Sequence, residues 1–248
     1  MKIKIILISY AFFNAISGYS QYMTDSVTIS GRVTDYDGNP LDSVSVFWQN
    51  EKFSVVHESI TDANGYYLSR IKRGKYYVMG AINMSEYPVA GSALPEDELR
   101  LEFWGWNFIA DRDTTFDMQY HRLEVYGVNV FRIQGATPGY TIYCRPMSLT
   151  RTLEDMKNPQ QKKRWSPGPQ ELDVKVTIDD EIMPVKMKQE VWEYFDVNES
   201  GNAYLLFVDL PKKKNNLPYH VFRIQMTDMG NGDKGEAVYF LEKQKYIE

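Results

Sequence analysis

Cysteine is almost absent from this chain of 248 residues, in which Cys144 is the single example. One thiol cannot form an internal disulfide, so an ordinary hydrophobic core must hold the fold together. Cys144 lies in the β-like run TIYCRPM. We therefore expect it to be a small core residue and not a nucleophile.

Long hydrophobic runs are absent after residue 20, and no later segment approaches the roughly 20 apolar residues of a membrane-spanning helix. The exception is the N-terminal stretch MKIKIILISYAFFNAISGYS, which has a basic start, an apolar middle and the small residues Gly18 and Ser20 at its end. This order is typical of a secretory signal peptide, with a buried N-terminal helix as the alternative. No cysteine stands near the expected cut, so lipoprotein processing is not indicated.

A surplus of basic residues is also lacking. The formal net charge is −5, and removal of residues 1–20 takes away Lys2 and Lys4 and no acid, which brings it to −7. An acidic surface of evenly mixed charges gives no electrostatic footprint for nucleic acid. The sequence therefore predicts no nucleic-acid partner.

Histidine is scarce, with only His57, His121 and His220. A zinc peptidase needs histidine and glutamate ligands at fixed spacing, and none of the three lies in an HxxE or HExxH motif. The chain also has no GxSxG motif, which would indicate a hydrolase nucleophile. A pair of carboxylates for glycoside hydrolysis cannot be chosen from 33 acids without the fold. We predict no catalytic residue, no metal site and no cofactor.

Two motifs resemble ligand sites but have simpler interpretations. GNGDKG, residues 230–235, fits GxGxxG, but the β-like run AVYFLE follows it where a dinucleotide site requires a helix. A hairpin loop is therefore the better interpretation. Asp35, Asp37 and Asn39 suggest calcium, but Gly38 is misplaced for an EF-hand loop. We expect these to be solvated side chains of a turn.

Short β-like runs separated by turn residues fill the chain. This pattern predicts an all-β protein of two antiparallel β-sandwich domains, residues 21–122 and residues 123–248, the second immunoglobulin-like. The runs of the first domain are residues 27–34, 44–48, 55–60, 66–71, 76–82, 99–108 and 114–120. Those of the second are residues 123–133, 140–144, 172–178, 183–194, 203–210, 219–226 and 237–242. One helical turn is expected at residues 153–157.

Residues 28–82 resemble the carboxypeptidase regulatory-like domain, a transthyretin-like β-sandwich. The resemblance rests on four segments in order: GRVTD at 31–35, GNPLDSVSV at 38–46, TDANGYYL at 61–68 and GKYYV at 74–78. In that family the domain accompanies metallocarboxypeptidases, outer-membrane receptors and other secreted proteins. The resemblance therefore implies a supporting or binding module without a reaction of its own, and it leaves the second half of the chain uncovered.

Aromatic residues are concentrated in LRLEFWGWNFI, residues 99–109. Alternation places Trp104, Trp106 and Phe108 on one strand face, with a switch of the apolar face near Gly105 that a β-bulge would explain. These three residues are the candidate ligand-binding group, since exposed rings can stack on sugars, and core packing is the alternative. We expect Trp106 and Phe108 to be core residues and Trp104 to be the more exposed tryptophan.

Together these features predict a non-enzymatic, exported module of the bacterial cell envelope that binds a glycan or a protein partner. The expected location is the periplasm, the outer-membrane surface or the cell exterior, and no transmembrane segment is expected. The alternative is a glycan-active hydrolase with its site in the C-terminal half. The 18 tyrosines favour a contact surface, because tyrosine offers area and a hydroxyl at low entropic cost.

The first testable prediction concerns processing. Gly18 and Ser20 satisfy the small-residue rule for signal peptidase, so the mature chain should begin at Gln21. N-terminal mass spectrometry of the exported protein measures this directly. Recovery of a chain that still begins at Met1 outside the cytoplasm would contradict it.

Overall fold

The computed structural model describes residues 25–88, 94–133, 135, 138–159, 162–197 and 199–244. The expected signal peptide, residues 1–20, and its cut before Gln21 lie outside these residues. With 56% of the chain in strands and 4% in helix, the all-β sandwich class is confirmed.

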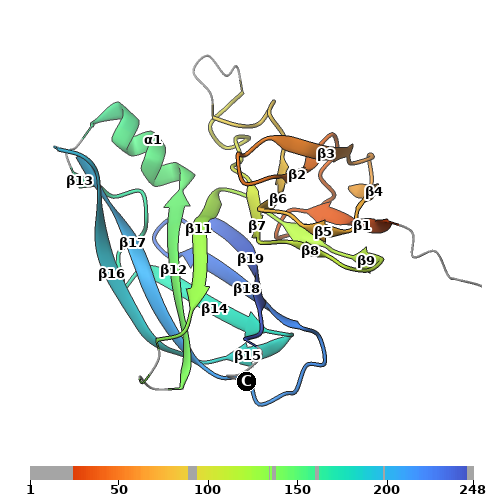
Figure 1. The fold of residues 1–248 in the computed structure, drawn as a ribbon. Coiled ribbons are helices and arrows are strands. Elements are labelled where there is room, and N and C mark those ends of the chain that lie inside the picture. Colours follow the sequence, from red (N-terminus) through yellow and green to blue (C-terminus); the bar gives the residue numbers. More distant parts are fainter. Residues whose placement is uncertain are drawn as a thin grey trace, which may run out of the picture.

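The strands follow the expected runs closely, and Figure 1 shows their arrangement. The first half contains β1 Ser26–Thr34, β2 Ser45–Gln49, β3 Val55–Ile60, β4 Tyr66–Lys72, β5 Gly74–Lys75, β6 Val78–Ile82, β7 Phe103–Trp106, β8 Ile109–Ala110, β9 Thr114–Thr115 and β10 Met118–Gln119. The second half contains β11 Leu123–Phe131, β12 Gly139–Ser148, β13 Lys162–Lys163, β14 Leu172–Ile178, β15 Glu181–Met183, β16 Val185–Asp196, β17 Glu199–Asp209, β18 Tyr219–Asp228 and β19 Lys234–Glu242.

One eight-stranded sheet runs through both halves of the chain, in the order β15-β14-β18-β19-β7-β6-β2-β3. The halves join where β7 pairs in parallel with β19, near the centre of the molecule in Figure 1. β19 is buried on both faces, which its unbroken apolar run AVYFL already indicates.

The first core lies between this sheet and the sheet formed by β10, β1 and β4. Strict alternation along β1 points Val27, Ile29 and Val33 into it, while the residues between them are only partly buried. The core also receives Tyr219, Val238 and Phe240 from the second half of the chain. They belong to the same buried cluster as Trp48, Phe103 and Phe108.

The second core lies between β14, β18 and β19 and the five-stranded sheet β11-β12-β17-β13, in which β16 pairs with the outer side of β17. Cys144 is fully buried there, and burial alone raises the pKa of its thiol far above the ordinary value. The prediction that Cys144 is a core residue is confirmed.

The helix α1 spans Leu149–Lys157, four residues longer at its start than the predicted turn. It begins early because the Ser148 hydroxyl accepts a hydrogen bond from the Arg151 backbone N–H at 3.3 Å, which caps the first turn. Within the part of the chain that the structure describes, no helix combines the length and the apolar character needed to cross a bilayer.

The sequence predicted that the polar side chains of the turn at residues 35–39 are solvated, but the Asp35 carboxylate is buried. Asp35 is only 8% exposed, and it accepts hydrogen bonds from the backbone N–H groups of Asp37 and Asn39, each at 2.9 Å. These bonds lower the pKa of the Asp35 carboxyl. Its carboxylate therefore serves the turn itself, where Gly38 takes a φ of 84°.

The loop GNGDKG joins β18 to β19, as its interpretation as a hairpin loop predicted. Two buried acids hold it against α1. Arg151 donates to both carboxylate oxygens of Asp228, at 2.5 and 2.9 Å. Asp233 accepts from the Ser148 hydroxyl at 2.7 Å and forms an ion pair with Arg122 at 3.2 Å.

The division into residues 21–122 and 123–248 remains a prediction. Strand pairing is continuous from β7 into β19, and the first core includes side chains of the second half. A fragment that ends at residue 122 would have to fold without these neighbours.

The second testable prediction follows from this shared core. Phe240 is 6% exposed, and its ring centroid lies 5.0 Å from that of Phe108. Phe240→Ala should lower the free energy of unfolding of the whole chain by about 3–5 kcal/mol, because it leaves a cavity. Urea denaturation measures the change. The control Leu68→Ala, at a residue 67% exposed, should change it by no more than about 0.5 kcal/mol, and equal effects would contradict the shared core.

Candidate functional site

Trp104 and Trp106 lie on the same face of β7. Their rings stack with centroids 5.3 Å apart and planes 18° from parallel. Tyr126 of β11 meets both rings edge-on, at 5.2 Å from Trp104 and 5.4 Å from Trp106. The halves of the chain therefore meet through three aromatic side chains.

Phe108 lies on the opposite face, away from the two tryptophans. It is 1% exposed and packs in the first core, with Trp48 and Phe116 among its neighbours. The expected bulge at Gly105 is wrong, because β7 pairs with β6 and with β19 without a register shift. The face changes at Asn107 instead, whose φ of 53° ends the regular alternation.

The expectation on burial is confirmed, since Trp106 is 6% exposed, Phe108 is 1% exposed and Trp104 is partly buried. The three residues do not form one surface, however. Trp106 faces a pocket, and Trp104 stacks against the Trp106 ring. The Phe108 side chain is buried in the first core. A binding role for the group stays a prediction.

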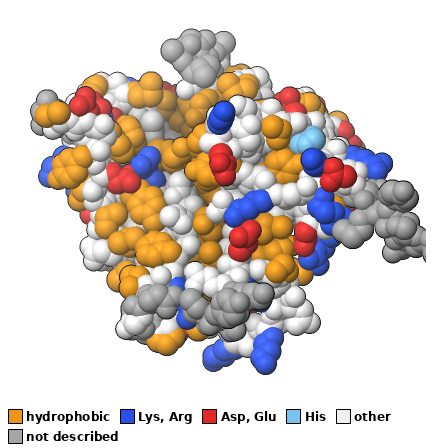
Figure 2. Space-filling model, viewed as in Figure 1, with side chains coloured by type: hydrophobic (Ala, Val, Ile, Leu, Met, Phe, Trp, Pro, Cys, Tyr) orange, Lys and Arg blue, Asp and Glu red, His pale blue; other side chains and the backbone are white. Residues whose placement is uncertain are grey.

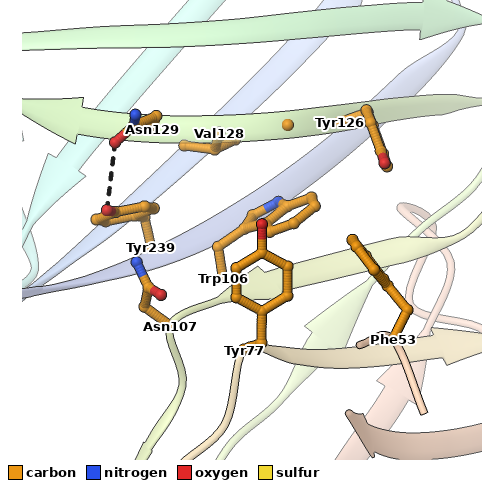
Figure 3. A pocket seen from close by; sticks show the side chains of 9 residues that line it. Phe53, Tyr77, Trp106, Asn107, Tyr126, Val128, Asn129 and Tyr239 are labelled. Atoms are coloured by element: carbon orange, nitrogen blue, oxygen red, sulfur yellow. Dashed lines mark hydrogen bonds between the residues drawn. The ribbon is translucent and has the colours of Figure 1, made fainter. Parts of the chain in front are cut away.

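The pocket next to Trp106 has a volume of about 430 Å³ and is drawn in Figure 3. Aromatic rings from separate parts of the chain converge on it. Its lining residues are Phe53, Tyr77, Trp106, Asn107, Tyr126, Gly127, Val128, Asn129 and Tyr239. We call it the aromatic pocket.

The rings of the aromatic pocket are held by one another. Tyr77 meets Trp106 edge-on at 5.8 Å, and Phe53 meets Tyr77 edge-on at 5.2 Å. The Tyr239 hydroxyl donates to the Asn129 side-chain oxygen at 3.3 Å, as the dashed line in Figure 3 marks. The pocket is therefore pre-formed, with apolar ring faces and amide and hydroxyl groups at its edge.

Three lining residues have left-handed backbone conformations: Phe53 with φ 56°, Asn107 with φ 53° and Gly127 with φ 63°. For a bulky residue such as Phe53 this conformation is a genuine outlier. Phe53 is also 45% exposed, so burial of its ring does not account for the conformation. The conformation belongs to the turn between β2 and β3, where the Phe53 backbone N–H donates to the Asn50 carbonyl at 2.9 Å.

A second hollow adjoins the aromatic pocket and shares Tyr77 and Asn107 with it. Its other lining residues are Asn50, Glu51, Lys52 and Lys75. Of the residues that the structure describes, no acid lines the aromatic pocket, and Glu51 is the single acid of the second hollow. Figure 2 shows charged side chains of both signs set among apolar ones across the face of Figure 1.

Most of the aromatic pocket was missed by sequence reasoning. Trp106 was selected from its local pattern, but Phe53, Tyr77, Tyr126 and Tyr239 come from four different segments. No spacing in the sequence connects them. The high tyrosine content was the one signal that pointed to such a surface.

Two buried glutamates lie on the other side of Trp104. Glu102 is 7% exposed and Glu124 is 3% exposed. Desolvation raises the pKa of Glu102 to about 7, although contact with Glu124 and Tyr87 opposes this. Desolvation and then the charge of Glu102 raise the pKa of Glu124 well above its ordinary value. The two carboxyls thus share protons near neutral pH.

The three histidines considered as zinc ligands in the sequence analysis contact other side chains or lie near them. His220 lies 2.6 Å from the Asp179 carboxylate, and His57 packs edge-on against Tyr76. Burial, followed by the nearby charge of Arg100, lowers the pKa of His121. Among the described residues, no three His, Cys, Asp or Glu side chains lie close enough together to hold a metal ion.

Comparison with known proteins gives no family. No protein-family model and no curated protein matches the chain. Solved structures that align with it include DUF3823 family proteins from Bacteroides ovatus and Parabacteroides merdae. The first has a TM-score of 0.27 at 9% identity and covers 88% of this chain and 97% of that one. The second has a TM-score of 0.27 at 10% identity and covers 88% and 98%.

BcpA, the major pilin subunit of Bacillus cereus, also aligns, with a TM-score of 0.27 at 11% identity over 87% of this chain and 69% of that one. Likenesses at this level carry no conclusion about function. The resemblance to the carboxypeptidase regulatory-like domain stays a prediction, and the functional argument depends on this chain's own side chains.

The third testable prediction concerns the buried glutamates, which face Trp104, Tyr87 and the charge of Arg145. Their raised pKa means that the folded chain favours the protonated forms. Stability should therefore be greatest below about pH 4.5 as far as this pair is concerned. The raised pKa of Glu102 alone should lower the stability by roughly 3 kcal/mol as the pH rises to 7, and the raised pKa of Glu124 should lower it further.

Glu124→Gln should remove the part of this loss that Glu124 causes and leave the part caused by the desolvation of Glu102, so the variant should be more stable than the natural chain at pH 8 and similar at pH 5. Urea denaturation at both pH values measures it, with the exposed helix residue Glu154→Gln as the control. The pKa values of Asp179 and Asp228 are lowered, so both carboxyls stay ionised at pH 5 and at pH 8. They therefore do not change the stability between these two pH values. An unchanged pH dependence in Glu124→Gln would contradict the prediction.

Proposed function

We propose that this protein is a non-catalytic binding module of the bacterial cell envelope, and that its aromatic pocket binds a saccharide. The observation that carries the proposal is the convergence of five aromatic side chains from separate segments on one pocket of about 430 Å³. Trp106 and Tyr239 belong to the second core, and Tyr77 and Tyr126 pack against it, so the pocket opens at the edge of that core, where Phe53 adds an exposed ring.

The chemistry of the pocket suits a sugar ring. A saccharide has apolar C–H faces and an edge of hydroxyls, so it needs flat apolar surfaces beside hydrogen-bonding groups. Phe53 and Tyr77 offer ring surface, while Asn107 and Asn129 offer amide donors and acceptors at the edge. Pockets with mainly apolar walls and a few placed polar groups are typical of small-molecule sites.

The lining favours binding over hydrolysis. Glycoside hydrolysis uses two carboxyls flanking the bond, about 5–10 Å apart. Within the described part of the chain, no carboxyl lines the aromatic pocket, and Glu51 alone lines the neighbouring hollow. Glu102 and Glu124 contact each other and lie on the other side of Trp104. The proposal therefore assigns no reaction to the site.

Export supports an envelope location, and it rests on the predicted signal peptide of residues 1–20. The acidic net charge after processing disfavours strongly anionic partners. The proposed ligand is accordingly a neutral saccharide, and a protein partner is the alternative that the experiment below can distinguish.

The fourth testable prediction uses Phe53, which is exposed and forms one wall of the aromatic pocket. A glycan array should give at least one saccharide ligand for the natural protein. Phe53→Ala should weaken that binding by about tenfold, because it removes one ring contact. The free energy of unfolding should change by no more than about 0.5 kcal/mol.

The matched control is Phe195→Ala, which removes a similarly exposed ring, 40% accessible, from strand β16 outside the pocket. It should bind the saccharide as the natural protein does. Equal loss in both variants, or no saccharide ligand at all, would contradict the proposal. Cleavage of the bound saccharide would favour the hydrolase alternative.

A further inference from the structure

A separate pocket of about 240 Å³ lies beside the helix α1, and we call it the helix pocket. Its walls come from α1, from β11 and β12, and from the segments before β7 and after α1. The lining residues are Tyr87, Pro88, Leu101, Glu124, Met147, Leu149, Thr152, Leu153, Met156 and Trp165. Most of these side chains are apolar, so the pocket is suited to an apolar body.

Among the described residues, Glu124 is the only acid that lines the helix pocket. Its neighbour across the ladder is Met147, and directly opposed residues of antiparallel strands project to the same face. Both side chains line the pocket, and Glu124 is 3% exposed. The apolar walls therefore surround one deeply buried carboxyl.

No ion pair found in the described chain compensates this carboxyl or its partner Glu102. The charge of Arg145 acts on Glu124, but Arg145 itself pairs with Glu193. Glu102 is in hydrogen-bond contact with Glu124, Tyr87 and Trp104. Buried carboxyls without a cation take up protons in place of a counter-ion, so a bound cation could replace a proton at this site.

We propose that the helix pocket binds a small organic cation, in which a primary ammonium group is carried on an apolar body. On binding, the ammonium would displace a proton from the Glu102 and Glu124 pair to solvent and would meet the resulting Glu124 carboxylate in a charge-assisted hydrogen bond, the strong form of that interaction. The body would lie against Leu101, Leu149 and Leu153, which pack together and form one wall of the pocket. The rings of Tyr87 and Trp165 would attract the positive charge at the pocket wall.

This site is independent of the aromatic pocket. The two pockets share no lining residue. A neutral saccharide has no charge to offer Glu124, and an ammonium ion finds no acid in the aromatic pocket. Failure of one proposal would leave the other standing.

Calorimetric titration at pH 7.5 tests the proposal with two probes of the same body. Hexylammonium should bind at least about tenfold more tightly than hexan-1-ol, which lacks the charge. Glu124→Gln should abolish this difference and leave the binding of hexan-1-ol unchanged, which also shows that the pocket is intact. Glu154→Gln removes the same charge from an exposed position on α1 outside the pocket, so it should bind as the natural protein does.

A second variant, Met147→Lys, places an apolar stem with its own ammonium group directly opposite Glu124. It should lose hexylammonium binding because the new side chain occupies the site. Equal binding of the two probes to the natural protein, or undiminished preference for hexylammonium in Glu124→Gln and Met147→Lys, would overturn the proposal.

Discussion

Three residues of β7 pair in parallel with three residues of β19, and the two halves of the chain share one sheet because of this short contact. Alternation along β19 then sends Val238 and Phe240 into the first core and Ala237 and Tyr239 into the second. The pairing also sets Tyr239 opposite Trp106. The aromatic pocket and both cores therefore depend on the same few backbone hydrogen bonds.

A second constraint acts at the end of β7. The left-handed conformation of Asn107 separates Trp106 from Phe108 and turns them to opposite faces. One ring then lines a pocket while the other completes the first core. Without this change of direction, strand periodicity would have placed both on one side. Asn is one of the few residues that tolerates such a backbone at modest cost.

Trp104 separates two environments of opposite character. On one side its stack with Trp106 supports a wall of the aromatic pocket, and on the other it faces the buried pair Glu102 and Glu124. Burying two acids together opposes folding near neutral pH, so packing elsewhere must offset it. The proposed cation in the helix pocket would relieve this cost, whereas the aromatic pocket needs no charge.

The sequence by itself determined the all-β class, the approximate bounds of most strands, the core position of Cys144 and the hairpin loop at 230–235, because alternation and turn chemistry are local. It indicated Trp106 as a candidate and ordered the burial of Trp104, Trp106 and Phe108 correctly. Only the tertiary structure decided the join of β7 to β19, the separation of Phe108 from the tryptophans and the meeting of Phe53, Tyr77, Tyr126 and Tyr239 in one pocket. It also brought Glu102 and Glu124 together. These contacts join strands distant in the chain, and strand periodicity gives the face of a side chain but not the strand that packs against it.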